Sequence, residues 1–302
     1  MNQPKLFSPK RTIVIAANTF TQLVRMKVFY FLAAFALILI GANFFQLPFS
    51  EGPDSSAEQA LTQLKSWSMG AMTLFSTIFA IVGTSLLLPR DVEDRTLYTI
   101  LAKPVPRLDY LAGKLLGILF LIFTSLVIMD ILTVGVLQFR LSGLVAEQTQ
   151  RLTTLGVDPA DIKTVTDQLA VQGPTWVMQA GILAIFLKAT VISAVALMIS
   201  TFSTSTLFTV VMSSLVYFIG HVQADAREFY SQQTEGVTWL SKGFAGLISL
   251  VFPDFQLYNV IDSAINGLAI TGEIMLKLGG ITLLYAAIYT VVSWFIFADK
   301  EF

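Results

Sequence analysis

The chain has 302 residues, of which 55% are hydrophobic and only 13% are charged, and its mean hydropathy is +0.72. Soluble domains carry about 25% charged residues, so this composition excludes an ordinary water-soluble enzyme. The formal net charge of −1 provides no basic field for nucleic acid. The absence of cysteine and the single histidine exclude disulfides, thiolate chemistry and multi-histidine metal sites. We therefore expect an all-α integral membrane protein with no catalytic residues, no metal site and no cofactor bound by this chain.

Apolar stretches long enough to cross a bilayer, which takes about 20 residues, predict six transmembrane helices within a single transmembrane domain (1–302). The expected spans lie at about residues 28–47, 69–88, 110–137, 177–199, 207–222 and 274–298. The fourth and fifth spans come from one uncharged stretch that is too long for a single helix. The Ser/Thr-rich run 200–206 divides it in two.

The basic residues sort the loops into two groups. The N-terminus, the loop 89–109 with Lys114 just beyond it, and the C-terminus together hold eleven Lys and Arg, whereas the longer loops on the other side, including 138–176 and 223–273, hold six. Cytoplasmic loops of membrane proteins carry the excess of Lys and Arg. Both termini are therefore expected in the cytoplasm.

The segment before the first span has an amphipathic pattern. Ile13, Ala17, Phe20 and Val24 recur at helical spacing, which predicts an amphipathic helix within residues 1–27 that lies along the cytoplasmic membrane surface. The alternative is a helical extension of the first span.

Two further segments have a predicted helical character. In the outer loop 138–176, Asp158 and Pro159 have the residue types of an N-cap and a first helical position, which predicts a small helical pair outside the membrane or, alternatively, a plain spacer. In segment 240–268 the apolar runs are about half a span long, and Pro253 and Asp254 interrupt them. Runs of that length favour a re-entrant or interfacial segment before the last span.

The loop 89–109 holds the densest charge in the chain. Its eight charged residues are Arg90, Asp91, Glu93, Asp94, Arg95, Lys103, Arg107 and Asp109. Leu97, Ile100 and Leu101 form an i, i+3, i+4 apolar stripe that Pro104 ends. A short amphipathic helix on the cytoplasmic side suits docking into a groove of a partner protein. The alternative is a solvated loop without a docking role, whose charges only reflect the usual excess of Lys and Arg in cytoplasmic loops.

This loop resembles the signature loop of type-2 ABC exporter permeases. In that family an acidic and basic cluster, often with Gly-Thr-Leu, precedes Leu-Leu-x-x-Pro-Val-x-Arg and then Leu-Gly-Lys. Here the matching residues run from Val92 to Arg107 and from Tyr110 to Lys114. Arg95-Thr96-Leu97 lacks the usual glycine, and Ala112-Gly113-Lys114 replaces Leu-Gly-Lys.

The resemblance implies a permease subunit in the cytoplasmic (inner) membrane of a prokaryote. It implies two partners besides the lipid bilayer: an ATPase subunit and a second permease chain, identical or related. ATP and Mg²⁺ would bind the ATPase, because this chain has no Gly-x-x-x-x-Gly-Lys-Ser/Thr loop. The loop helix would be the coupling helix seated on that ATPase. Its expected interface residues are Asp91, Glu93, Asp94, Arg95, Thr96, Leu97, Ile100, Leu101, Lys103 and Arg107.

Two ionisable residues inside the predicted spans, Lys188 and Asp130, are candidates for the translocation pathway, since intramembrane charges are costly and often functional. The alternatives are that Asp130 reaches the outer interface and that Lys188 snorkels or pairs within the bundle. For His221 we expect packing or a hydrogen bond rather than a ligand role. Two other functions stay open: an ion-coupled secondary transporter, and a membrane anchor or assembly scaffold that transports nothing.

Overall fold

The computed structural model of the protein describes residues 8–42, 57–93, 106–203, 205–232 and 252–298. The regular elements in these ranges are all helices, in agreement with the expected all-α class. They are α1 (Pro9–Val24), α2 (Lys27–Ala42), α3 (Ala57–Glu93), α5 (Arg107–Thr154), α6 (Pro159–Val171), α7 (Trp176–Phe202), α8 (Thr206–Gln232), the 3₁₀ helix η2 (Phe255–Tyr258), α10 (Ile261–Ile265) and α11 (Gly272–Ala298).

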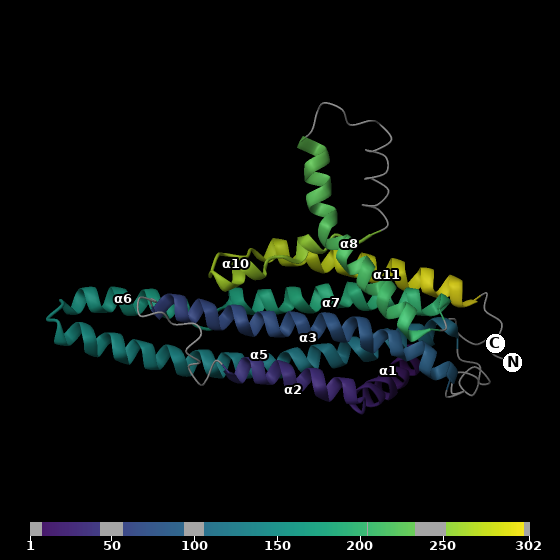
Figure 1. The fold of residues 1–302 in the computed structure, drawn as a ribbon, viewed down its shortest axis with the longest axis horizontal. Helices are drawn as coiled ribbons and strands as arrows, with labels where there is room; N and C mark the ends of the chain where they lie inside the picture. The colour runs from purple at the N-terminus through teal and green to yellow at the C-terminus, as the bar shows by residue number, and fades with distance from the viewer. Residues whose placement is uncertain (1–7, 43–56, 94–105, 204, 233–251, 299–302) are drawn as a thin grey trace.

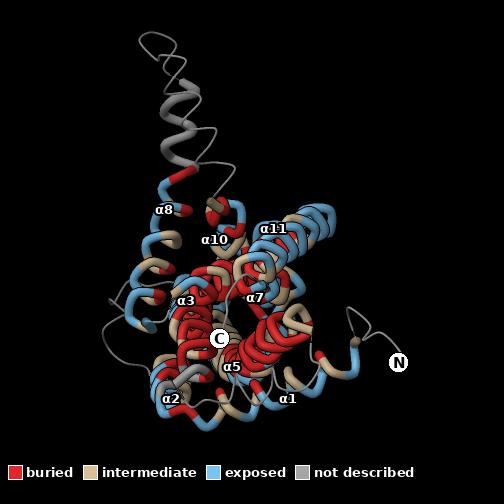
Figure 2. Tube along the Cα trace, turned by 90° about the vertical axis from the view of Figure 1, so that its right-hand side faces the viewer, coloured by how far each residue is buried: buried red, intermediate tan, exposed pale blue. Residues whose placement is uncertain are grey.

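The long helices except α8 lie side by side in an elongated bundle with α3 and α7 at its centre, and α8 crosses this bundle and projects from it (Figures 1 and 2). In their most apolar stretches, 78% of α7 and 72% of α3 is buried by the rest of the chain, against 22% of α8 and of α11. The outer helices instead expose large apolar side chains, such as Phe218 on α8 and Leu283 and Phe295 on α11. A bundle with an apolar exterior is suited to lipid rather than to water.

Five helices, α3, α5, α7, α8 and α11, are long and apolar enough to cross a membrane. The sixth expected span corresponds to α2, which has 16 residues and passes the same test only together with α1. The two helices meet at a bend of 69°. Thus α1 is a separate helix, as the amphipathic pattern predicts, and not a straight continuation of α2. The predicted break in the long uncharged stretch is confirmed, because α7 ends at Phe202 and α8 begins at Thr206.

The third expected span is part of a much longer helix. α5 continues to Thr154, and at roughly 1.5 Å per residue its 48 residues extend about 72 Å, more than twice the hydrocarbon thickness of about 30 Å. α6 returns beside it, so the two form a hairpin at one end of the bundle, on the left in Figure 1. The predicted cap of α6 is confirmed, with Asp158 Oδ1 accepting from the Ala160 N–H at 2.9 Å. The turn before it depends on Gly156, whose φ of 72° favours glycine.

Two short helices precede the last long one. η2 packs against α7 and α8, and α10 packs against α7 and α3. A pair of short helices agrees with the expected pattern for this segment, although residues 240–251 lie outside the described ranges.

A close helix contact fixes α1 on α5. A Cβ atom at Gly117 would lie 2.6 Å from Thr19 Cβ and 2.7 Å from the Ala16 carbonyl oxygen, and one at Gly113 would lie 2.7 Å from Ile15 Cβ. Glycines four residues apart allow two helix backbones to approach this closely. The buried face of α1 is therefore the one that carries Thr19, while Ile13 stays 64% exposed.

We expect Gly117→Val to separate α1 from α5, because the added side chain meets backbone and cannot be accommodated by a rotamer change. Overpacking of this kind costs about 1–3 kcal/mol, which a lowered thermal unfolding midpoint in detergent would report. Gly135→Val is the matched control, since nothing lies within 4 Å of that position on the same helix. Equal destabilisation by the two variants would contradict the close contact.

Candidate functional site

A buried ion pair lies where α3 ends and α5 begins, which we call the basal end of the bundle. Lys114 Nζ is 2.6 Å from Asp91 Oδ2, and the two side chains are only 2% and 6% exposed. The Tyr110 hydroxyl donates to the same carboxylate oxygen at 2.5 Å. Gln22 of α1 lies at the edge of the pair, with its Oε1 3.4 Å from Lys114 Nζ. The pair thus joins α3, α5 and α1 in one polar contact.

A second carboxylate at the basal end attaches the start of α1. Asp109 is fully buried, and its two oxygens accept from the Ser8 backbone N–H at 3.1 Å and from Arg11 Nε at 2.9 Å. The Ser8 N–H lies at the N-terminus of a helix, where a negative charge is favourable. Asp109 therefore acts as a cap for α1 that is supplied by another helix.

Arg107 connects the start of α5 to the end of α11. Its Nη1 donates to the carbonyl oxygens of Phe297, at 2.6 Å, and Ala298. The guanidinium carbon also lies 5.8 Å from the centre of the Phe297 ring. The last carbonyls of a helix have no partner within the helix and carry partial negative charge, so a cation is favourable there.

Together these contacts form the basal cluster, defined by Asp91, Arg107, Asp109, Tyr110 and Lys114. It lies at both ends of the loop 89–109, for which the resemblance to exporter permeases predicts a coupling role. Of the expected interface residues, Asp91 and Arg107 belong to this cluster. The backbone of Glu93 ends α3, while Asp94, Arg95, Thr96, Leu97, Ile100, Leu101 and Lys103 lie outside the described residues.

A second polar cluster surrounds Lys188 in the middle of α7. Lys188 Nζ lies 2.9 Å from His221 Nε2 of α8 and 5.5 Å from the centre of the Tyr217 ring. Gln256 of η2 donates to the His221 carbonyl oxygen at 3.2 Å, and the Thr77 side chain of α3 lies beside that of Tyr217. The structure therefore brings Lys188 and His221 together, which the sequence treats as unrelated.

Asp130 has other surroundings. Its Oδ1 accepts from Gln179 Nε2 of α7 at 3.1 Å. Sequence reasoning missed a further buried contact near the hairpin: Lys65 Nζ donates to Gln172 Oε1 at 2.6 Å, and Gln172 Nε2 donates to Glu58 Oε1 at 3.0 Å. Lys65 was expected only as a loop charge, because distant residues such as Gln172 cannot be paired with it by spacing.

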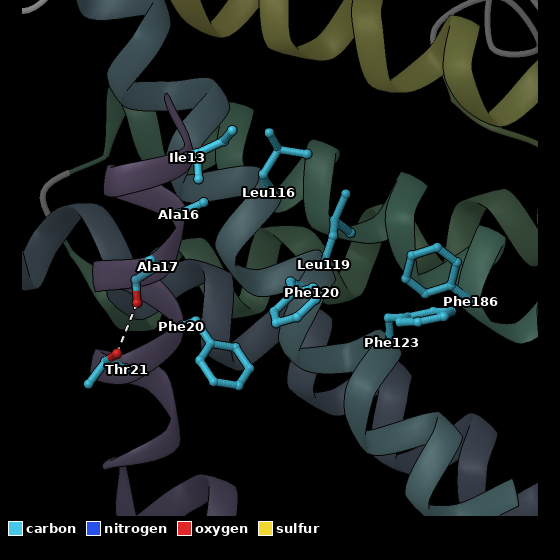
Figure 3. A pocket seen from close by; sticks show the side chains of 10 residues that line it. All are labelled: Ile13, Ala16, Ala17, Phe20, Thr21, Leu116, Leu119, Phe120, Phe123 and Phe186. Atoms are coloured by element: carbon cyan, nitrogen blue, oxygen red, sulfur yellow. Dashed lines mark hydrogen bonds between the residues drawn. The ribbon is translucent and has the colours of Figure 1, made fainter. Parts of the chain in front are cut away.

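An apolar groove of about 590 Å³ lies between α1 and α5 (Figure 3). Ile13, Ala17 and Phe20 line it from α1, Leu116 and Phe120 from α5, and Phe186 from α7. These α1 residues belong to the predicted apolar stripe. Ile13 and Ala17 of the stripe are therefore exposed at the groove, while Phe20 contacts Phe120 of α5 and Thr12, Thr19 and Leu23 are buried.

Comparison with protein-family models gives no match to this chain, and comparison with curated proteins gives none either. Within the described ranges, no group of three or more acidic or histidine side chains is arranged to hold a metal ion. The candidate function therefore rests on the two polar clusters and on the loop sequence.

We expect Lys114→Met to destabilise the protein by about 3–5 kcal/mol, because it leaves the buried Asp91 carboxylate without its cation. The double variant Asp91→Asn with Lys114→Met should lose less than the sum of the single losses, and unfolding in detergent measures all three.

Lys277→Met is the control, because the Lys277–Glu273 pair is 69% and 75% exposed and such pairs contribute no more than about 1 kcal/mol. Additive losses at Asp91 and Lys114 would show that the buried pair is not energetically coupled.

Proposed function

We propose that this chain is the transmembrane permease subunit of an ATP-binding-cassette exporter. It forms half of a translocation pathway with a second permease chain, identical or related, in the cytoplasmic membrane of a prokaryote. A separate ATPase subunit binds ATP and Mg²⁺ and docks on the loop 89–109. The basal end, with both chain termini, faces the cytoplasm, and the α5–α6 hairpin faces outward.

The observation that carries this proposal is the basal cluster at the two ends of the loop. Asp91 lies three residues before residues 94–105 and Arg107 two residues after them. The contacts of the basal cluster extend to α1, α3, α5 and α11, and the carboxylate and ammonium groups at the centre of the cluster are buried. A solvated loop that only carried the usual cytoplasmic excess of Lys and Arg would need no such attachment to four helices.

The basal cluster suggests how movement of the loop would reach the membrane. Buried ion pairs are costly to break singly, so the ends of α3 and α5 move as one body with the start of α1 and the end of α11. An ATPase that closes on ATP would displace the loop and tilt this body, a rigid-body transition between two discrete states. α8 and α11, with apolar outer faces, then meet lipid or the second permease chain. The short helices η2 and α10 form the interfacial or re-entrant segment.

The docking site is tested with Leu97→Asp. The loop sequence predicts that Leu97 enters a dry groove of the ATPase, where a charge costs several kcal/mol. The variant should therefore recover at least about tenfold less ATPase when the tagged permease is purified from cells that also express the candidate ATPase encoded beside it.

Leu155→Asp is the matched control, because Leu155 is 70% exposed in the turn between α5 and α6 at the other end of the bundle. It should recover the ATPase in full. Normal recovery and normal coupled ATP turnover with Leu97→Asp would refute the assignment of the loop as the coupling segment.

A further inference from the structure

Lys188 places a cationic group deep in the bundle without an acidic partner. It lies 12 residues after the start of α7 and 14 before its end, about 18 Å and 21 Å along the helix. The residue is only 7% exposed. Among the described residues its polar contact is His221, and no carboxylate lies within ion-pair distance of its ammonium. This differs from Lys114, which has Asp91 beside it.

The hydrogen bonds of His221 fix its tautomer. Its Nδ1 lies 3.1 Å from the Tyr217 carbonyl oxygen, and a carbonyl can only accept, so Nδ1 carries the hydrogen. The neutral ring then has a lone pair on Nε2, which accepts from Lys188 at 2.9 Å. Because the imidazole is neutral, it satisfies one N–H of the ammonium but balances none of its charge. Asp254, whose charge acts on His221, does not pair with Lys188.

The residues around Lys188 are partly exposed. His221, Tyr217 and Gln256 are each partly exposed, so the contact is not sealed inside the bundle. The Tyr217 and Phe255 rings form an apolar wall beside it, with their centres 5.6 Å apart and the His221 ring 4.4 Å from Tyr217. On the same helix Leu215 and Phe218 are exposed to the surroundings of the bundle.

We propose that Lys188, with His221 as a partner that the ligand displaces, is a binding site for the anionic head group of an amphiphile, a phosphate or carboxylate attached to an apolar chain. The anion replaces His221 as the partner of the Lys188 ammonium and supplies the negative charge that the site lacks. A charge-assisted hydrogen bond of this kind is stronger than the one to the neutral imidazole.

The depth of the site selects for an amphiphile rather than a water-soluble anion. A free anion would lose its hydration on reaching the middle of the bundle, at a cost that one lysine does not offset. A ligand with an apolar chain gains free energy by placing that chain against apolar side chains or lipid. As a statement about transport, this inference rests on the proposed function and names the substrate class as anionic amphiphiles. As a statement about binding, it needs no ATPase.

The single histidine makes the test direct. The protein labelled with ¹⁵N-histidine and purified in dodecyl maltoside gives ring signals from His221 alone. Added dodecyl phosphate should move the Nε2 signal in a saturable way at one fixed pH, since the hydrogen bond from Lys188 is lost. Inorganic phosphate, which has the same head group without the chain, should leave the signal in place.

Two variants identify the cation. Lys188→Gln should weaken dodecyl phosphate binding by at least about tenfold, since a hydrogen bond to a charged group is lost. Lys163→Gln, an exposed lysine on α6, should bind like the wild type. His221→Leu frees Lys188 and should bind dodecyl phosphate at least as tightly in calorimetry, which keeps the test independent of the folding of the Lys188 variant.

Three results would overturn the inference: no saturable shift, binding that Lys188→Gln retains, or loss of binding in His221→Leu that elutes as a monodisperse peak. An equal response to inorganic phosphate would overturn the amphiphile part. These measurements use the permease alone. A negative result for dodecyl phosphate binding therefore does not contradict the proposed docking of the ATPase. A negative result in the ATPase recovery experiment likewise does not contradict the proposed binding site.

Discussion

The contact between Asp91 and Lys114 is the constraint on which the basal end depends. Both charges are buried, so each needs the other, and the Tyr110 hydroxyl and Gln22 complete their hydrogen bonds. Because the partners come from α3 and α5, the two helices cannot slide past each other without exposing a charge to an apolar surrounding. The Asp109 contacts extend the same constraint to α1, and those of Arg107 extend it to α11. The ends of four helices are therefore held together beside the loop 89–109.

Elsewhere the bundle is held by close packing rather than by charge. α7 is the central helix, and much of its surface is made of alanine, serine, threonine and glycine, which let its neighbours approach closely. Gly181 is an example, because a Cβ there would lie 2.6 Å from Ala264 Cβ of α10. Gly117 plays the same part between α1 and α5. Small residues thus allow the closest helix contacts, and large apolar residues such as Met72 and Phe79 fill the core between the helices.

Much of the architecture could be predicted from hydropathy, because span length and charge-free runs are local properties. The break at residues 200–206 and the Asp158 cap could also be predicted, because both depend on residue types that are adjacent in the sequence. Two kinds of feature could not be predicted. The length of α5 beyond residue 137 depends on its hairpin with α6, and the polar partners of Lys65, Lys114 and Lys188 lie 107, 23 and 33 residues away in sequence. Nothing in the periodicity of one helix indicates which residue of another will face it. The coupling role that the loop's resemblance to exporter permeases implies remains a prediction.

The two polar clusters lie at different depths, and among the described helices α3 is the one that contributes to both. Asp91 joins the basal cluster, while Thr77, 14 residues earlier on the same helix, lies beside the Tyr217 side chain next to Lys188. A continuous helix transmits displacement along its axis with little loss, and these two positions are about 21 Å apart. Movement of the loop that shifts the end of α3 would therefore shift Thr77 against α8. Tyr217 supplies both the ring beside Lys188 and the carbonyl that fixes the His221 tautomer. The same movement would therefore change the contact between Lys188 and His221. Under the two proposals above, movement of α3 at the basal end would thus alter the site for an anionic head group.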